Sequence, residues 1–513
     1  MKQNGEREEQ QNWLLRQWNR LRRGRWRDVI IGQVGEGATN VIIGKNNVQV
    51  NVSGRNLTLP IWMISGALVV IVGFLVYPFV EPIWWPTQIG GQFGIAVADF
   101  GEVDARNRVR ATARGEVLSK WFFDNLFYEY ENATDIAQGI KIWHDDAPNI
   151  QKNINFGIIK GDSAEERRQS AARLAERIGA HMVIYGNLIP AADRQELVLE
   201  FYLSPQVPDE TATLVGSHRL GKPITLPAQL DIGDPSANLA LGELLKMRTG
   251  PFFWLTVGLK QAILGRSAQA LATFLQAERT LTNWREEDGK EILYFFIGRE
   301  ELFLGHVENA IANLERALAI EPEYARARIA LGSAYLKRAR SLPPPERFAP
   351  PYDLETALEH YLAGLALAQQ MEEPLVEQIA HLALAKSYRL FAETYYHLDD
   401  PAEARRYFEL TRQEAAAVVE PLAAANQHRL VAQAFEVEGA AYLQEADLLL
   451  RQDRPGESIP LLDKAKVAYQ NCIDQGKQVV IDEVLTAQVI DQGCQRYYAL
   501  TEEYIHNLRE QEQ

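Results

Sequence analysis

The sequence predicts a multidomain fold: a basic N-terminal region with a short β repeat, a single transmembrane helix, a small α/β domain and an all-α helical solenoid. Three observations predict it. An uncharged apolar run lies near the N-terminus, strand-like and helix-like segments alternate after it, and only helical periodicity remains from Pro251 onward. We expect these parts to span residues 1–57, 59–80, 91–228 and 250–478, with a C-terminal capping helix at 479–513.

Charge is distributed unevenly along the 513 residues. Residues 1–57 hold ten Lys and Arg against five Asp and Glu, whereas the whole chain has a net charge of −15. An acidic body repels phosphate at long range, so no nucleic-acid partner is expected. Cys472 and Cys494 do not form a CxxC pair, which excludes a zinc site or a thioredoxin-like motif built on one. They could form one disulfide, but two buried free thiols are the expected arrangement.

The N-terminal region begins with a basic amphipathic segment, residues 11–27 (QNWLLRQWNRLRRGRWR). Such a pattern suits an anionic inner-leaflet surface, although a solvated basic tail that only enforces topology is an equal alternative. The candidate membrane-surface residues are Trp13, Arg16, Trp18, Arg22, Arg23, Arg25 and Trp26. After it, the sequence VIIG at 29–32 recurs at 41–44, and with 48–52 it predicts two or three short strands.

A transmembrane helix is predicted at residues 59–80, which lie in a stretch without a charged residue from 56 to 80. About 20 helical residues cross the ~30 Å hydrocarbon core. The candidate interfacial anchors are Trp62, Tyr77, Trp84 and Trp85. The basic flank is N-terminal, and no Lys or Arg follows the span until Arg106, so the positive-inside rule places residues 1–57 in the cytoplasm and 87–513 outside it. A buried core helix is the alternative interpretation.

The middle region alternates strands with helices and therefore predicts an α/β sheet. A capping box, Ser163 to Glu166, should open one helix and Gly179 should end it. The other expected helix is 106–129. The expected strands are 92–100, 140–143, 154–159, 181–186, 196–203 and 211–220, the last two of them antiparallel.

Four short motifs in this region carry a resemblance: VADF at 97–100, ARLA at 172–175, GA at 179–180 and VIYG at 183–186. They resemble the N-terminal domain of TolB and the CsgG/FlgO-like lipoproteins of bacterial envelopes. That resemblance implies a role in assembly and interaction.

Catalytic chemistry has only weak candidates here. Asp99 at a strand end, and His144 with Asp145 and Asp146, could serve acid–base or metal chemistry, but a third convergent ligand is missing. Asp99 suits a turn and His181 a packed position. We therefore predict no enzyme activity, no metal and no cofactor.

The C-terminal half repeats a pattern of small and aromatic residues with a period of about 34 residues. Aligned units start at 251, 291, 325 and about 385, and a looser fifth unit follows. A 13-residue insertion, SLPPPERFAPPYD, separates the two helices of the third unit. The positions that carry the pattern are Trp254, Gly258, Phe274, Tyr294, Gly298, Leu314, Pro322, Gly332, Tyr361, Ala392, Phe408, Gly439 and Tyr442.

This half resembles the tetratricopeptide-repeat family over roughly 230 residues. The resemblance implies stacked helix pairs whose first helices line a groove for protein partners. Family members that bind chaperone tails hold two carboxylates with Lys and Asn at set positions. Here those positions carry Leu255, Leu259, Phe296 and Ala330, and only Arg326 is basic, so an apolar ligand or self-association is expected. The candidate groove residues are Leu255, Leu259, Phe296 and Arg326. Packing of the apolar three between repeats is the alternative.

The expected function is a membrane-anchored adaptor that recruits protein partners outside the cytoplasm. The alternative is a membrane-acting effector or sensor subunit of a bacterial conflict or signalling system, in which the span oligomerises. Gly66 and Gly73 on the predicted span give that alternative some support.

Overall fold

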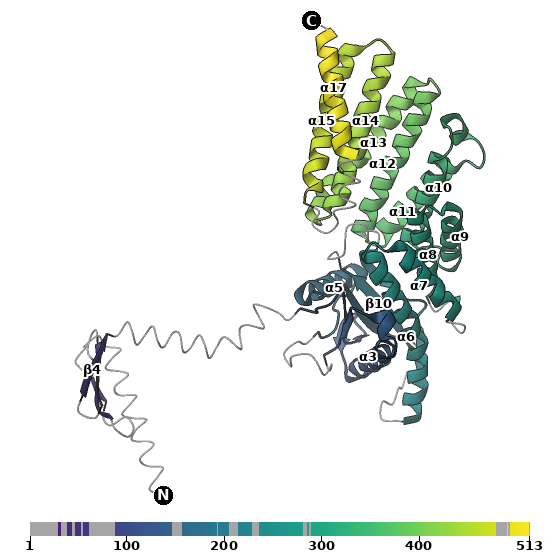
Figure 1. Cartoon of the computed structure of the whole chain (residues 1–513). Coiled ribbons are helices and arrows are strands. Elements are labelled where there is room, and N and C mark those ends of the chain that lie inside the picture. The colour runs from purple at the N-terminus through teal and green to yellow at the C-terminus, as the bar shows by residue number, and fades with distance from the viewer. Residues whose placement is uncertain are drawn as a thin grey trace. The chain divides into compact units, whose positions relative to one another are not determined.

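The computed structural model describes residues 29–31, 38–43, 47–52, 55–60, 88–145, 156–191, 193–204, 214–227, 235–280, 285–286, 289–478, 490 and 493–511. The chain divides into two compact units, Met1–Pro86 and Thr87–Gln513 (Figure 1). The predicted membrane-surface residues, residues 61–80 of the predicted span and its four aromatic anchors lie outside the described residues. Within the part that is described, no helix combines the length and the apolar character needed to cross a bilayer.

The first unit contains an antiparallel meander of four described strands. These are β1 (Val29–Ile31), β2 (Ala38–Ile43), β3 (Asn47–Val52) and β4 (Arg55–Pro60). The VIIG repeat therefore predicts β structure correctly, although one strand was missed. Because Leu59 pairs with Val48 and Pro60 with Asn47, the predicted start of the span is wrong for these two residues, which belong to β4.

The second unit begins with a mixed sheet in the order β11-β10-β9-β5-β8. β5 is parallel to β8 and β9, and β9 is antiparallel to β10. β10 and β11 are antiparallel, as expected. Only Ile158 of the predicted strand 154–159 makes a described bridge, with Asp99. The short β6, β7 and β12 extend the sheet. The strands are β5 (Phe93–Val97), β6 (Gly101–Val103), β7 (Val109–Ala111), β8 (Ile140–Trp143), β9 (Met182–Pro190), β10 (Arg194–Leu203), β11 (Gly216–Arg219) and β12 (Ile224–Pro227).

Local capping decides where the helices of this domain begin. α5 (Ala164–Ile178) has the predicted capping box of Ser163 and Glu166, and it ends at Gly179 in the left-handed conformation (φ 64°). α3 (Ala113–Asn132) begins later than the predicted residue 106, at the N-cap Thr112. The predicted start is wrong because Asp104 accepts hydrogen bonds from the backbone N–H groups of residues 106 and 108, which closes the β6–β7 turn instead. A short α4 (Thr134–Ala137) follows.

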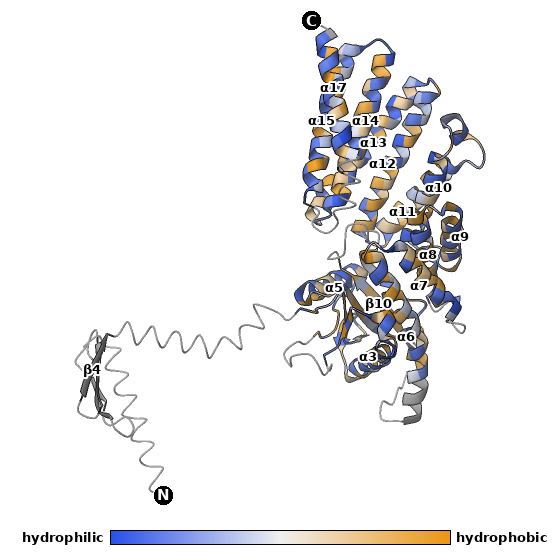
Figure 2. Cartoon of the chain, viewed as in Figure 1, coloured by the Kyte–Doolittle hydropathy of each residue, from blue (hydrophilic) through white to orange (hydrophobic). Residues whose placement is uncertain are grey.

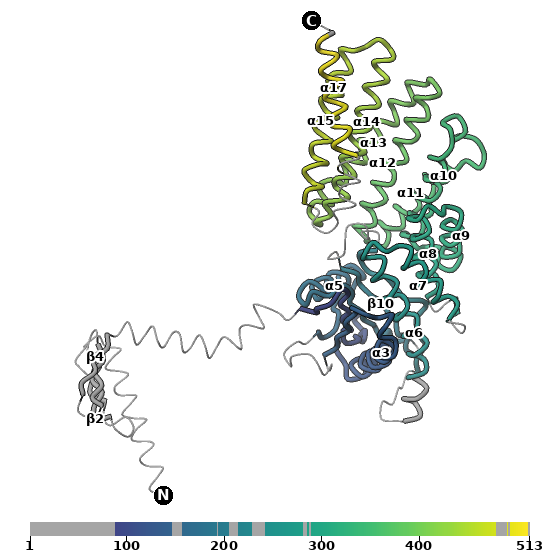
Figure 3. Tube along the Cα trace, in the orientation of Figure 1, coloured from purple at the N-terminus to yellow at the C-terminus, as the bar shows by residue number. Residues whose placement is uncertain are grey.

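The two faces of the sheet are covered by different helices, because side chains alternate along each strand. Ala96, Ala98 and Val183 pack with the apolar face of α5. On the other face, Ile95, Val97 and Phe201 share one core with α3 and with α6 (Pro235–Ile263), the first helix of the repeat region. The repeats are thus built directly onto the sheet, and α6 lies beside α3 and β10 in Figure 3.

Successive helix pairs form the all-α region, in which hydrophilic and hydrophobic residues alternate along the helices (Figure 2). α6 begins well before the predicted start at Pro251, which lies inside it. The remaining helices are α7 (Ser267–Thr280), α8 (Lys290–Leu304), α9 (Val307–Ile320), α10 (Ala325–Arg340), α11 (Asp353–Gln370), α12 (Pro374–His397), α13 (Pro401–Ala424), α14 (His428–Arg451), α15 (Pro455–Gly476) and α17 (Arg496–Gln511), with the 3-10 turn η3 (Pro344–Phe348).

Each pair crosses where a glycine or alanine of the first helix meets a large residue of the second. A Cβ atom on Gly258 would lie 2.2 Å from the Phe274 ring, and one on Gly298 would lie 2.7 Å from Leu314. In both pairs the partner follows sixteen residues later. Gly332 meets Tyr361 in the same way across the insertion, so this contact is preserved although the chain between its partners is longer. The small residue is what allows the two helices to approach.

The proline-rich insertion packs onto the next pair of helices. The Arg347 guanidinium donates a hydrogen bond to Glu393 of α12 over 2.8 Å. The Phe348 ring lies 5.6 Å from the Phe391 ring and 4.9 Å from the Tyr395 ring, measured between centroids. The insertion therefore links α10 and α11 to α12.

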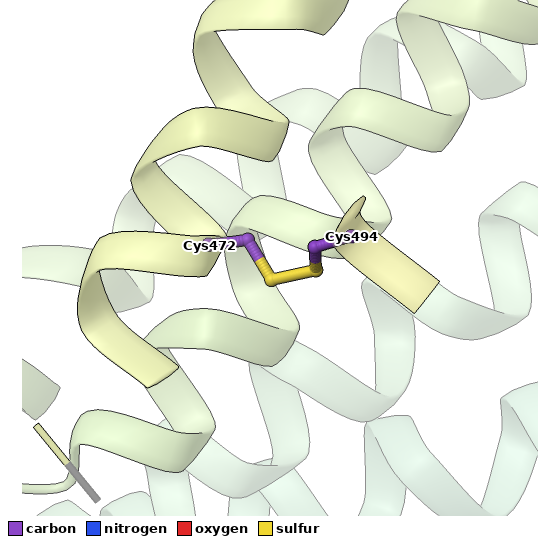
Figure 4. The surroundings of a disulfide bond; sticks show 2 residues. All are labelled: Cys472 and Cys494. Carbon is purple, nitrogen blue, oxygen red and sulfur yellow. A yellow bond between two sulfur atoms is a disulfide. The ribbon is translucent and has the colours of Figure 1, made fainter. Parts of the chain in front are cut away.

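Cys472 of α15 and Cys494, which precedes α17, form a disulfide (Figure 4). Both cysteines are fully buried, and their Cα atoms lie 6.2 Å apart, within the range that a disulfide allows. The expectation of two free thiols is therefore wrong. Their separation of 22 residues in sequence does not reveal that α17 packs back against α15.

The crossing geometry predicts that two glycines of α6 respond in opposite ways to replacement by alanine. Gly258→Ala should lower the free energy of unfolding by about 1–2 kcal/mol, because the new methyl group overlaps Phe274. Gly242→Ala has nothing within 4 Å of the added atom and should raise the stability by about 0.5–1 kcal/mol through helix propensity. Thermal denaturation followed by circular dichroism compares the two, and equal effects would contradict the crossing.

Candidate functional site

Three of the four predicted groove residues lie in the core. Leu255 and Leu259 of α6 are fully buried, and Phe296 of α8 is 1% exposed. The Phe296 ring lies 5.4 Å from that of Phe274 and 6.2 Å from the imidazole of His218. These side chains pack between the first repeats and the sheet, as the packing alternative predicts, and offer no surface to a partner.

The fourth residue, Arg326 of α10, has a different environment. It is 6% exposed, pairs with Glu373 over 3.7 Å and lines a cleft between the repeats and the α/β domain. Its position near His218 and Tyr324 depends on contacts between distant parts of the chain. The sequence pattern identified Arg326 as different but could not place it there.

The polar residues of the α/β domain form a buried cluster at the carboxyl ends of β5 and β8. The Ser119 hydroxyl lies 3.2 Å from the Asp99 carboxylate and 3.3 Å from Nε2 of His144. Asp99 approaches that same nitrogen at 3.6 Å. The hydroxyl and this carboxylate thus lie at the same ring nitrogen, whereas a catalytic triad places them at opposite nitrogens. Asp146 lies outside the described residues.

His181, the other polar residue considered in this domain, has a structural role. His181 accepts a hydrogen bond at Nδ1 from the backbone N–H of Gly94 over 3.0 Å, and burial lowers its pKa. Among the described residues, no group of three His, Cys, Asp or Glu side chains could hold a metal ion.

A cluster of four cations lies on the first helices of three successive pairs, and we call it the basic cluster. It consists of Arg340 of α10, Lys386 and Arg389 of α12, and Arg429 of α14. α12 contacts both α10 and α14, and Lys386 donates a hydrogen bond to Gln433 of α14 over 2.8 Å. Arg340 is exposed and the other three are half-buried. The cluster is therefore accessible to a ligand.

The positive charges in the basic cluster act on one another. The pKa of Lys386 is lowered to about 8. Burial is the largest cause, the charges of Arg340, Arg429 and Arg389 act in the same direction, and Glu436 opposes them. Glu393, the other nearby carboxylate, already accepts a hydrogen bond from Arg347. An anion bound among these cations would relieve their mutual repulsion.

Two buried polar atoms in or next to the basic cluster have no hydrogen-bond partner among the described residues: Nε of Arg389 and the hydroxyl of Tyr469. Buried polar groups normally have partners, so a ligand that supplied them here would stabilise the site. The sequence did carry a signal for this site. Lys386 and Arg389 occupy, in the fourth unit, positions like those of Arg326 in the third unit and Leu255 in the first.

Comparison with protein families identifies the repeats around this site. Residues 298–338 match the family model described as TPR repeat. This segment is a TPR repeat. It covers the end of α8, all of α9 and most of α10, where the crossing glycines Gly298 and Gly332 stand 34 residues apart. TPR repeats imply protein partners.

Other comparisons add little to the TPR assignment. No curated protein matches the chain. Among solved structures, the crystal structure of TTC0263, a thermophilic TPR protein in Thermus thermophilus, is 20% identical. The alignment covers 46% of this chain and 97% of that chain with a TM-score of 0.27.

The electrostatics predict that the pKa of Lys386 moves in opposite directions in two variants. Arg340→Gln should raise it above about 8, because a neighbouring positive charge is lost, and Glu436→Gln should lower it, because a favourable negative charge is lost. NMR titration of isotopically methylated lysines measures both. A native Lys386 that titrates near 10.5, the ordinary lysine value, would contradict the cluster.

Proposed function

We propose that the protein is a membrane-anchored TPR scaffold whose basic cluster binds an acidic segment of a partner protein. The observation that carries the proposal is the convergence of four cations from α10, α12 and α14. These are the first helices of their pairs, the ones that line the recognition surface of stacked helix-pair repeats. Electrostatic complementarity of this kind selects the partner and accelerates its association.

The acidic ligand replaces the apolar ligand that the sequence favoured. That expectation came from Leu255, Leu259 and Phe296, which are buried against the sheet and its helices. On the first helices of the later pairs, the exposed or half-buried residues include the four cations of the basic cluster. A carboxylate can accept hydrogen bonds from Arg389 and Lys386 together, and charge-assisted bonds of this kind are about twice as strong as neutral ones.

The membrane anchor rests on the sequence. The uncharged residues 56–80 and the basic segment before them support a single span with a cytoplasmic N-terminus. The buried disulfide supports an extracytoplasmic location for the repeats, because disulfides persist in oxidising compartments. The effector alternative rests on Gly66 and Gly73, which lie outside the described residues, and no described feature favours it.

Binding of an acidic peptide tests the basic cluster. A synthetic octapeptide of alternating Asp and Glu with a free C-terminus should bind the full-length protein in detergent, and its Asn/Gln counterpart with an amidated C-terminus should not. The double variant Lys386→Gln, Arg389→Gln should lower the affinity roughly tenfold. Binding should also weaken as the pH rises through about 8, where Lys386 loses its charge. Fluorescence anisotropy of the labelled peptide measures all three.

The matched control for this double variant is Arg406→Gln. Arg406 lies on α13, the second helix of its pair, where it is 63% exposed and pairs with Glu403. Its loss removes a positive charge without touching the cluster. If Arg406→Gln weakens binding as much as the double variant does, the attraction is nonspecific and the proposed site is wrong.

Topology is tested separately in bacterial spheroplasts. External protease should degrade residues 87–513, and Cys472 and Cys494 should resist thiol labelling until the protein is denatured and reduced. Full protection of the C-terminal part from protease, together with labelling after denaturation alone, would reverse the proposed orientation.

A further inference from the structure

A cleft of about 530 Å³ lies between the α/β domain and the repeats. Its walls come mainly from β10 and β11 on one side, and from the start of α8, the α9–α10 turn with the start of α10, and the α11–α12 turn on the other. Pockets for small molecules typically have volumes of about 300–1,000 Å³. The cleft is separate from the basic cluster, none of whose residues lines it.

His218 of β11 is a buried wall residue with an unused hydrogen-bonding atom. The side chain is 5% exposed, and its ring stacks on Phe201 at 5.0 Å between centroids. Nε2 lies 2.6 Å from the carbonyl oxygen of Leu214 and therefore carries the proton that it donates there. Nδ1 has no hydrogen-bond partner in the described part of the chain.

The protonation state of His218 follows from its surroundings. Burial, and then the positive charge of Arg326, lower the pKa of His218 to about 3. The ring is neutral at physiological pH, so Nδ1 is a hydrogen-bond acceptor. A group that satisfies it must bring an N–H or O–H donor.

The charge of the cleft lining favours one class of hydrogen-bond donor over others. The described lining contains six glutamates against two arginines and one lysine. Arg326, the buried cation, is already paired with Glu373 over 3.7 Å. Glu321, Glu323 and Glu372 are exposed at the rim. The hydroxyl of Tyr324 is a second buried atom without a partner among the described residues and can accept a hydrogen bond.

We propose that this cleft binds a guanidinium or ammonium group. The group would donate to Nδ1 of His218 and to the Tyr324 hydroxyl, with its positive charge balanced by the rim glutamates. An anion without a hydrogen to donate would leave Nδ1 of His218 unpartnered, and it would face the excess of carboxylates. The source is either a free small amine or a basic side chain of a protein. This site is distinct from the proposed acidic-segment site and does not depend on it.

Occupation of the cleft would couple the two parts of the second unit. The sheet contributes His218, and the repeats contribute Tyr324 and the rim. A ligand held by both sides stabilises their joint arrangement, because binding to the folded state raises the free energy of unfolding by mass action.

Three probes test the proposal on the full-length protein in detergent: agmatine, the peptide acetyl-Ala-Arg-Ala-amide, and the same peptide with neutral citrulline in place of arginine. Isothermal titration calorimetry should detect binding of at least one cationic probe and at least tenfold weaker binding of the citrulline peptide. Tighter binding of agmatine identifies a small amine as the ligand class, and tighter binding of the arginine peptide identifies a protein side chain. Both results support the proposal.

Variants locate the binding. His218→Phe keeps an aromatic ring and removes the acceptor, so affinity should fall about tenfold, which corresponds to a lost charge-assisted hydrogen bond. Tyr324→Phe removes only a hydroxyl and serves as a second variant if His218→Phe does not fold. It should lower the affinity about threefold. The double variant Glu321→Gln, Glu323→Gln should lower the affinity about fivefold. Glu420→Gln, an exposed charge on α13, should change nothing.

Four results would overturn the proposal. Two of them are equal binding of the arginine and citrulline peptides, and unchanged affinity in folded His218→Phe and Tyr324→Phe proteins. The third is binding of inorganic phosphate, in place of the cations, that His218→Phe abolishes. The fourth is no detectable binding of agmatine or the arginine peptide.

Discussion

The apolar contact between the sheet and α6 is the constraint on which the arrangement of the second unit depends. The Phe252 ring of α6 lies 5.4 Å from that of Phe122 on α3 and 5.6 Å from that of Phe201 on β10. From Phe201 the aromatic contacts continue through His218 to Phe296 of α8. Because α6 is also the first helix of the repeats, burying it against the sheet fixes where the stack begins. Polar contacts reinforce this, since Glu291 of α8 accepts a hydrogen bond from the backbone of Gly221.

That shared core determines which surfaces remain for partners. In an isolated repeat stack, the positions of Leu255 and Leu259 would belong to the first helix of a recognition surface. Here the α/β domain occupies that region, and the later pairs carry the basic cluster on their first helices. The same packing creates the cleft, because β11, the starts of α8 and α10 and the α11–α12 turn approach without filling the space between them. Two surfaces of opposite charge result: a basic cluster on the first helices and an acidic rim at the cleft.

Local sequence patterns predicted the positions of helices and strands well. They did not predict which elements pack against one another. The capping box of Ser163 and the small residues Gly258 and Gly298 act within a few turns of the chain, so the sequence shows them directly. The late start of α3 was missed because Asp104 favours a turn that competes with the helix. The burial of Phe296, the pairing of Cys472 with Cys494 and the unpartnered Nδ1 of His218 all arise from contacts between distant segments, which one sequence does not reveal. Lys386 and Arg389 were visible in the sequence, but their significance depends on Arg340 and Arg429 across two helix interfaces.

The proline-rich insertion has a mechanical consequence. In repeat stacks each pair of helices contacts only its neighbours, so a pulling force is taken up by small rotations at every interface. Arg347 and Phe348 add side-chain contacts between the insertion of the third pair and α12. Rotation at that interface would have to break the ion pair and the aromatic contacts as well as the packing between helices. Under tension this joint should therefore be stiffer than its neighbours, and stretching would concentrate in the pairs on either side of it.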